Sequence, residues 1–346
     1  MKTQEHTFYH EKDFQLESGS ALPGLQLKYA TLGKLNADKS NAVWICHALT
    51  GSSNFPDWWG GLFNEDGPFD PNEYFVICVN VLGGCYGSTG PTSINPKTNN
   101  PYFKDFPAIT NNDVVRAFDL LRLHLGIEKI HTLIGGSLGG QQVLSWAIDQ
   151  PTVFRNLIPI ACNAVSSPWS IAINEAQRMA ITSDPTWQNI DANAGQEGLK
   201  AARAISMITF RSYEAFEEQL NENSHELDHY KAASYQQYQG EKLAKRFDAH
   251  TYWTLSKMMD SHHVGRYHSM PELALAKIKA NTLVVGINSD LLFPLSEQEF
   301  ITRNIDQAKL EVIDSPYGHD AFLIETTRLS EIIHQFLRAE SNYVLR

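Results

Sequence analysis

Short apolar runs that are typical of buried strands alternate with amphipathic helical patterns in the first and last parts of this 346-residue chain. Uninterrupted apolar runs predict strands that are covered on both faces, as the strands of a parallel sheet are. The predicted strands cover residues 42–46, 74–79, 132–134, 157–161, 282–287 and 310–313. With helices such as residues 112–125 between them, they predict an α/β fold in which a mostly parallel sheet is flanked by helices.

The alternation stops between residues 163 and 270, where no strand pattern is found. Amphipathic helical segments replace it, at residues 172–180, 195–208, 212–220 and 242–259. A change of pattern inside one chain indicates an insertion between two strands of the sheet. We therefore expect residues 1–162 and 271–346 to form the α/β core and residues 163–270 to form an inserted helical lid.

The run from Gly135 to Gly140 places Ser137 between a β-branched strand pattern and a helical one that ends before Pro151. Glycines around a serine at such a strand-turn-helix junction let the backbone approach closely and expose the hydroxyl, in the arrangement called a nucleophile elbow. The pattern Gly-x-Ser-x-Gly is common, and its flanking strand and helix make it informative. It predicts covalent catalysis by Ser137.

A serine nucleophile needs a base, and the base needs a carboxylate that orients it. Enzymes with such an elbow carry these groups in the order Ser, Asp, His. Asp290 follows the predicted strand 282–287, and His319 follows the strand 310–313. Because loops at the carboxyl ends of parallel strands share one edge of the sheet, we expect Ser137, Asp290 and His319 to form a catalytic triad there.

Acyl transfer through a tetrahedral intermediate also needs two N–H donors for the oxyanion. The residue after the nucleophile, Leu138, supplies the first backbone N–H. The second is expected from the loop 47–53, which follows the strand 42–46, and Leu49 is our candidate there. The oxyanion hole is thus predicted to consist of the Leu49 and Leu138 amides.

The charge balance and the cysteines limit the class of protein. The 39 acidic residues outnumber the 28 lysines and arginines, which form no basic stripe, so nucleic acid is not expected as a partner. The four cysteines lack CxxC spacing and are expected to be free thiols in a reducing compartment. The first residues lack an apolar signal segment, and no run is long enough to cross a membrane. We expect a cytoplasmic protein without a membrane partner.

Two further patterns contain some of the residues that ligand sites use. The glycine-rich loop 82–91 lacks the Gly-Lys-Ser/Thr ending of a phosphate-binding loop. Asp260, His262 and His263 lie close together in the sequence, but adjacent histidines do not form the i, i+4 pair of a helical zinc site. We expect no metal.

With these motifs in place, the chain resembles the homoserine O-acetyltransferase family of the α/β-hydrolase superfamily. The resemblance extends over residues 24–337, and its most specific motifs are residues 47–52, 80–85, 87–91, 134–140, 210–212, 259–266 and 318–323. It implies acetyl transfer from acetyl-CoA to the γ-hydroxyl of L-homoserine through a serine acyl-enzyme, in methionine biosynthesis, with no permanently bound cofactor. It also implies that Arg211 and Asp320 hold the amino acid, and that the lid helices form a homodimer interface.

Some alternatives remain open at this stage. Succinyl-using members share the same motifs, and a serine O-acyltransferase would differ in the distance from the acceptor hydroxyl to Arg211 and Asp320. An esterase or thioesterase uses the same triad with water as the acceptor. A catalytically inactive scaffold is disfavoured by the order of the triad and by the presence of both oxyanion loops.

Overall fold

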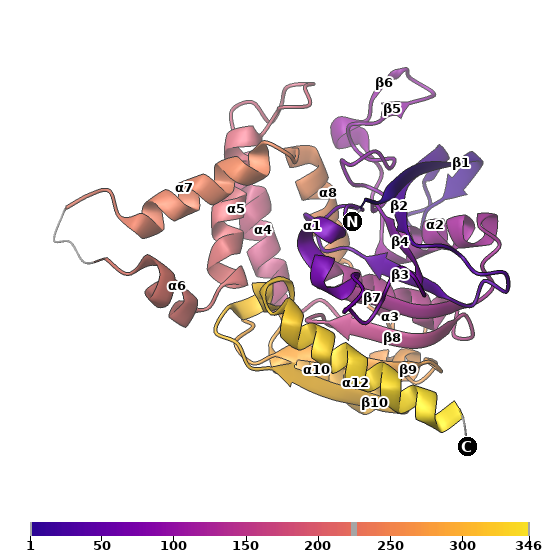
Figure 1. The fold of residues 1–346 in the computed structure, drawn as a ribbon. Helices are drawn as coiled ribbons and strands as arrows, with labels where there is room; N and C mark the ends of the chain where they lie inside the picture. Colours follow the sequence, from indigo (N-terminus) through magenta and orange to yellow (C-terminus); the bar gives the residue numbers. More distant parts are fainter. Residues whose placement is uncertain (1, 223–226, 345–346) are drawn as a thin grey trace.

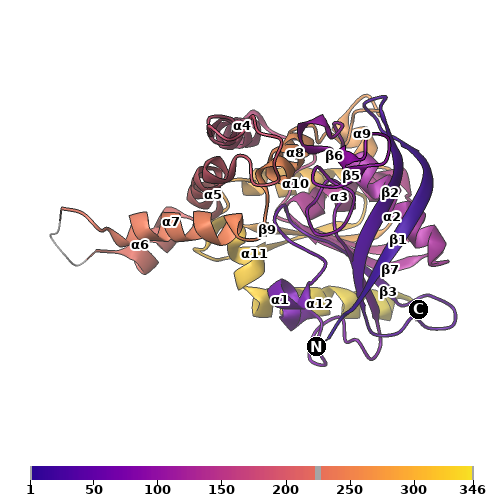
Figure 2. The same ribbon diagram turned by 90° about the horizontal axis from the view of Figure 1, so that it is seen from above.

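The computed structural model describes residues 2–222 and 227–344, and it consists of a twisted sheet covered by helices on both faces (Figures 1 and 2). The sheet has eight strands, of which the first, second and third in the spatial order pair antiparallel and the others pair parallel. In that order they are β1 (Gln4–Gln15), β2 (Ala21–Leu32), β4 (Phe75–Val79), β3 (Ala42–Cys46), β7 (Ile130–Gly136), β8 (Phe154–Ile160), β9 (Asn281–Ile287) and β10 (Ala308–Ile313). The predicted α/β fold with a mostly parallel sheet is confirmed.

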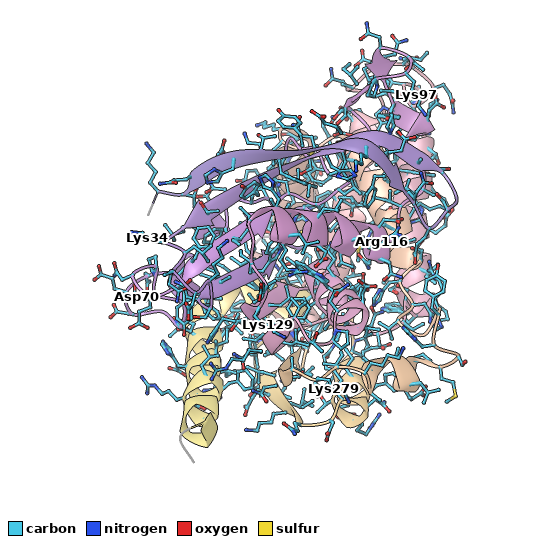
Figure 3. The ribbon with its side chains drawn as sticks, turned by 90° about the vertical axis from the view of Figure 1, so that its right-hand side faces the viewer. Lys34, Asp70, Lys97, Arg116, Lys129 and Lys279 are labelled. Carbon is cyan, nitrogen blue, oxygen red and sulfur yellow. The ribbon has the colours of Figure 1, made fainter. Side chains whose placement is uncertain are left out.

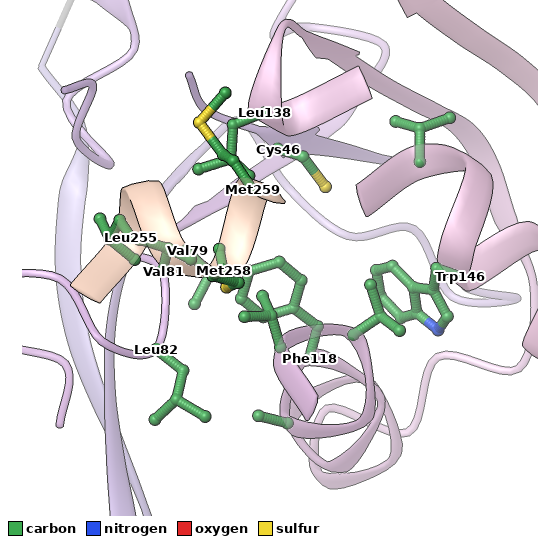
Figure 4. Packing of buried hydrophobic residues seen from close by; sticks show 14 of the residues in the cluster. Cys46, Val79, Val81, Leu82, Phe118, Leu138, Trp146, Leu255, Met258 and Met259 are labelled. Carbon is green, nitrogen blue, oxygen red and sulfur yellow. The ribbon is translucent and has the colours of Figure 1, made fainter. Parts of the chain in front are cut away.

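Two hydrophobic cores lie on opposite faces of the sheet because successive side chains of a strand point to opposite sides. In β3, Trp44 and Cys46 belong to one core, and Val43 and Ile45 belong to the other. The first core contains residues of α2 (Asn111–His124), α3 (Leu138–Asp149), α9 (Pro271–Leu275) and α10 (Leu295–Asn304). Figure 4 shows part of it, where Phe118 of α2 and Trp146 of α3 lie side by side. The second contains residues of α1 (Pro56–Trp59), α11 (Ala321–Ile324) and α12 (Thr326–Val344). Burial on both faces explains the uninterrupted apolar sequence of the central strands.

Helices replace strands between β8 and β9. They are α4 (Pro168–Thr182), α5 (Gln196–Phe210), α6 (Tyr213–Leu220), α7 (Lys231–Ala244) and α8 (Ala249–Asp260), followed by α9. Helices α4, α5 and α8 pack on one another above the edge of the sheet, whereas α6 and α7 project away from it (Figures 1 and 2). The two ends of the insertion meet where Val165 and His263 form an antiparallel bridge.

Two parts of the fold differ from the sequence prediction. The segment 242–259, expected as one helix, is divided between α7 and α8, because the Asp248 side chain caps α8 by accepting the Thr251 N–H at 2.7 Å. The long hairpin of β1 and β2 was not predicted. Strand β1 lies at the edge of the sheet and is largely exposed, so its sequence lacks the apolar run that identified the central strands.

On the side of the molecule that Figure 3 shows, basic residues are scattered, as they are along the sequence. The lysines and Arg116 labelled in Figure 3 are distributed over that side of the molecule and do not gather in one patch. Among residues 2–222 and 227–344, no helix is both long enough and apolar enough to cross a bilayer.

Candidate active site

Ser137 lies at a sharp turn between β7 and α3. Its φ of 57° and ψ of −122° are strained for a residue with a side chain. The strain is held by backbone hydrogen bonds on both sides: Ser137 N–H donates to Ile160 O at 2.9 Å, and Gln141 N–H donates to Ser137 O at 3.1 Å. The predicted nucleophile therefore has the backbone geometry of an elbow.

The neighbouring glycines are required by close contacts. A Cβ on Gly139 would lie 2.0 Å from Cys46 O and 3.1 Å from His47 O, so only glycine lets the first turn of α3 approach the end of β3. A Cβ on Gly136 would lie 2.6 Å from the Phe322 ring. The glycine pattern that marked the elbow in the sequence thus follows from packing of the elbow against two other segments.

Asp290 and His319 form a buried pair at the carboxyl ends of β9 and β10. His319 Nδ1 lies 2.7 Å from Asp290 Oδ2. The other carboxylate oxygen, Asp290 Oδ1, accepts the N–H groups of Leu292 at 2.8 Å and Phe293 at 2.9 Å, which fixes the carboxylate plane. Burial alone would lower the pKa of His319, but the Asp290 charge and hydrogen bond, together with the Asp320 charge, raise that pKa above its ordinary value. Asp290 therefore orients the His319 ring and stabilises its protonated form, as the carboxylate partner of a catalytic histidine does.

Three phenylalanine rings surround His319. The ring centroids of Phe293 and Phe322 lie 5.4 Å from that of His319, and the Phe210 centroid lies 5.5 Å away. Phe322 also touches Gly136, so it joins the histidine to the elbow. Within the described chain, the Ser137 side chain makes no hydrogen bond. Sequence reasoning had assigned no function to these phenylalanines, although Phe322 lies three residues after His319.

The two predicted oxyanion donors lie on segments that the Gly139 contact brings together. Leu138 is the first residue of α3, so its N–H has no acceptor within the helix. Leu49 lies in the turn closed by Gly51 N–H and Ala48 O at 2.8 Å. Next to it, His47 Nε2 accepts the Val81 N–H at 3.0 Å, and Nδ1 donates to Ala48 O at 2.8 Å.

Burial lowers the pKa of His47 to about 4, so the ring is neutral near pH 7 and keeps this arrangement of one donor and one acceptor. Through its bond to the Val81 N–H, the neutral ring holds the loop that carries Leu49 in place. The sequence had shown His47 only as part of the loop 47–53. Because His47 lies two residues before Leu49, its position in the sequence could have indicated that its side chain supports this loop.

Arg211 and Asp320 lie beside the catalytic histidine candidate. Arg211 Nε is 3.3 Å from Asp320 Oδ2, in a geometry that provides charge attraction without a directed hydrogen bond from Nε. Both side chains are largely buried, with exposed fractions of 18% and 16%. Ser212 fastens this end of α5 to the loop that carries His319 by donating its hydroxyl to Pro316 O. The structure therefore brings a positive side chain from the inserted helical segment and a negative side chain from the α/β core together beside His319.

The residues around Asp260 serve other purposes than metal ligation. Asp260 pairs with Arg178 at 2.5 Å and accepts the Asn174 side-chain amide at 2.8 Å. The His262 side chain is buried, and both of its ring nitrogens form hydrogen bonds to neutral groups. Among the residues that the structure describes, no group of three or more His, Cys, Asp or Glu side chains could hold a metal ion.

Comparisons with known proteins agree with this architecture. A family model described as the alpha/beta hydrolase fold matches residues 41–326. The chain is 48% identical to a homoserine O-acetyltransferase of Cyclobacterium marinum, over 96% of this chain and 95% of the relative. It is 45% identical to the enzyme of that name from Nostoc punctiforme, over 93% of both chains.

Solved structures show the same fold in enzymes with different names. The homoserine O-acetyltransferase from Bacillus anthracis superimposes with a TM-score of 0.91 at 26% identity, over 97% of this chain and 98% of that one. The esterase E22 superimposes with a TM-score of 0.89 at 25% identity, over 97% of this chain and 100% of that one. The fold alone therefore does not separate transfer to an acceptor from hydrolysis.

Proposed function

The chain belongs to the homoserine O-acetyltransferase family of the α/β-hydrolase fold, and on that basis we propose that it transfers an acetyl group from acetyl-CoA to the γ-hydroxyl of L-homoserine. The observation that supports a free amino acid as the acceptor is the Arg211–Asp320 pair beside His319, and the names of the relatives favour homoserine among the amino acids. A free amino acid presents one carboxylate and one ammonium group. When the substrate binds, it replaces the contact between the two side chains. The planar guanidinium then pairs with the substrate carboxylate, and the aspartate pairs with its ammonium group.

In the first half of the proposed reaction, His319 takes the proton of the Ser137 hydroxyl as the serine oxygen attacks the thioester carbonyl carbon. The Leu49 and Leu138 amides stabilise the oxyanion of the tetrahedral intermediate. The carbon–sulfur bond then breaks, and the leaving thiol takes the proton from His319. This half leaves an acetyl ester on Ser137 and free CoA.

In the second half, homoserine binds between Arg211 and Asp320, and His319 removes the proton from its γ-hydroxyl. The alkoxide oxygen attacks the acetyl ester, and Ser137 leaves with the proton that His319 returns. Asp290 keeps His319 in the tautomer that both halves require. The ping-pong scheme needs no metal and no permanently bound cofactor.

The inserted helices are proposed to act as a lid that keeps water from the acetyl-enzyme. Phe210 at the end of α5 lies against His319, and the next residue, Arg211, lies against Asp320, so the insertion covers the base directly. A site that excludes water favours an acceptor hydroxyl over hydrolysis. We assign the lid to residues 163–270 and the core to residues 1–162 and 271–346.

We also propose a homodimer formed by the projecting helices α6 and α7. Their surface carries the exposed aromatic side chains of Tyr213 and Tyr238 on an arm that extends from the molecule (Figure 2). The four cysteines are unpaired, and three of them are buried, which supports a reducing cytoplasmic location. Sedimentation of the purified protein tests the dimer, because a monomer at micromolar concentration would contradict it.

The function is tested by thiol release from acetyl-CoA in the presence of L-homoserine, L-serine or no acceptor, with succinyl-CoA in parallel. We expect release that depends on both acetyl-CoA and homoserine, with O-acetylhomoserine as the product by mass spectrometry. Dependence on serine or on succinyl-CoA would replace the proposed acceptor or donor. Release at the same rate without acceptor would show a hydrolase instead.

A further inference from the structure

Four polar side chains from distant segments meet in a buried cluster below the elbow. They are Asn111 at the start of α2, Gln141 in α3, Asn163 after β8, and His262 after α8, and we call them the polar network. Each is nearly or fully buried, with exposed fractions from 0% to 4%. None of them was used in the mechanism above.

The polar network joins the returning end of the insertion to the turn that carries the nucleophile. Gln141 lies one helical turn after Ser137, and its own N–H donates to Ser137 O. At the other end, His262 O accepts the Ser166 N–H at 2.9 Å, next to the bridge between the two ends of the insertion. A chain of side-chain hydrogen bonds therefore runs from the root of the inserted helices to the first turn of α3.

One fixed acceptor determines the direction of every bond in the polar network. His262 Nε2 lies 3.2 Å from Asn163 O, and because a carbonyl only accepts, Nε2 carries the proton. His262 Nδ1 is then an acceptor, so Asn111 must present its NH₂ group to it at 3.2 Å. The same NH₂ group donates to Gln141 Oε1 at 3.2 Å, which leaves Gln141 Nε2 to donate to Asn163 Oδ1 at 2.8 Å.

This directed chain requires a neutral His262. A proton on Nδ1 would face the Asn111 NH₂ group, and burial lowers the pKa of His262 to about 3, so the ring stays neutral at working pH. Asn111 Oδ1 and Asn163 Nδ2 have no partner among the described residues. Apolar side chains in place of the polar network would leave no such unpaired group.

We propose that His262 is a positioning residue. Its hydrogen bonds hold Gln141, and through it the Ser137 elbow, in a fixed position relative to the inserted helices. The proposal rests on the assignment of Ser137 as the nucleophile. It predicts that loss of the His262 hydrogen bonds slows attack by Ser137 without weakening the Arg211–Asp320 acceptor site, which the polar network does not touch.

The test uses His262→Phe, which keeps a planar ring and removes both hydrogen bonds. The matched control is Ser256→Ala, because Ser256 is fully buried on α8, the helix that precedes His262, but accepts a hydrogen bond from Arg178 of α4 at 3.2 Å and has no bond to the elbow. For each variant we would measure the rate of Ser137 labelling by a fluorophosphonate, kcat, KM for homoserine and the thermal midpoint of unfolding. These four readouts separate positioning of the serine from a general loss of stability.

We expect the labelling rate and kcat of His262→Phe to fall on the order of 10- to 100-fold, with KM little changed, since small displacements of a reacting group have effects of that size. Ser256→Ala should retain both rates even where its thermal midpoint falls. Labelling of His262→Phe at the wild-type rate, or an equal loss in Ser256→Ala, would overturn the proposal. Absence of labelling in the wild-type protein would instead refute Ser137 as the nucleophile.

Gln141→Met gives a second route in case the phenylalanine variant does not fold. It has a similar volume but cannot donate to Asn163, so it cuts the polar network within α3 itself. We expect the same fall in labelling rate at unchanged KM, and no further loss when His262→Phe is added, because both substitutions break one chain. A wild-type labelling rate in Gln141→Met, or independent and additive losses in the double variant, would contradict the proposal.

Discussion

Replacement of Asp290 by asparagine tests the orientation of the base, because the structure fixes which end of the new amide must face His319. The oxygen Oδ1 accepts two backbone N–H groups, from Leu292 and Phe293. An asparagine that kept its oxygen there would place its NH₂ group at the Oδ2 position, 2.7 Å from His319 Nδ1. His319 would then present a lone pair at Nδ1 and carry its proton on Nε2, where it cannot accept the serine proton.

The size of the effect follows from the cost of the reversed amide. Reversal would place the NH₂ group against two buried N–H donors and leave both unsatisfied, at about 1–3 kcal/mol each. The productive tautomer is therefore disfavoured by about 2–6 kcal/mol, which corresponds to a fall in rate of roughly 30- to 3 × 10⁴-fold. Since the variant differs from the wild type by one atom, burial and packing of the side chain are retained.

The assay is the pre-steady-state rate of acetylation of Ser137, followed by CoA release, in Asp290→Asn and in the control Asp314→Asn. Asp314 follows β10 at the same edge of the sheet, is exposed, and bonds Asn288 instead of a histidine. The tautomer of His319 can be read from its ring-nitrogen NMR shifts. Thermal unfolding of both variants shows whether the fold is intact.

An Asp290→Asn enzyme that keeps a wild-type acetylation rate would refute this reasoning. So would a large loss in the Asp314→Asn control. A slow variant whose His319 still carries its proton on Nδ1 would show that charge, and not the tautomer, is the main contribution of Asp290.

Three further predictions concern the same site. Ser137→Ala should fold normally and show no acetyl mass shift after incubation with acetyl-CoA; a persistent shift on the intact protein would exclude the serine ester. Gly139→Ala should lower the free energy of unfolding by at least about 1–3 kcal/mol in urea titrations, because its Cβ would lie 2.0 Å from Cys46 O, and an unchanged midpoint would contradict the packing argument. Asp320→Asn removes a charge that raises the pKa of His319. Because the base must be neutral to act, the acidic limb of the pH profile of kcat should move to lower pH. An unmoved limb would show that this charge has no influence.

Much of the core could be read from the sequence because the signals are local. The central strands are covered on both faces, so each is an apolar run that needs no knowledge of its neighbours. The hairpin of β1 and β2 escaped this reasoning since β1 is exposed at the edge. The break between α7 and α8 escaped it because the helical pattern continues across the capping residue Asp248.

The sequence by itself determined the strained turn at Ser137, and it predicted the order of the proposed triad and the loops of the proposed oxyanion hole. Strained backbone at Ser137 needs particular neighbours within a few residues, and parallel strands bring the loops that follow them to one edge whatever their separation in the chain. These are consequences of local geometry and of topology.

Only the tertiary structure decided which groups surround the base and what holds the elbow. Phe210, Phe293 and Phe322 reach His319 from three separate segments, and His262 reaches Gln141 through Asn111 across more than a hundred residues. Burial, hydrogen-bond direction and the pKa of a histidine all depend on partners that are distant in the chain. No pattern in the sequence specifies such partners before the segments have packed together.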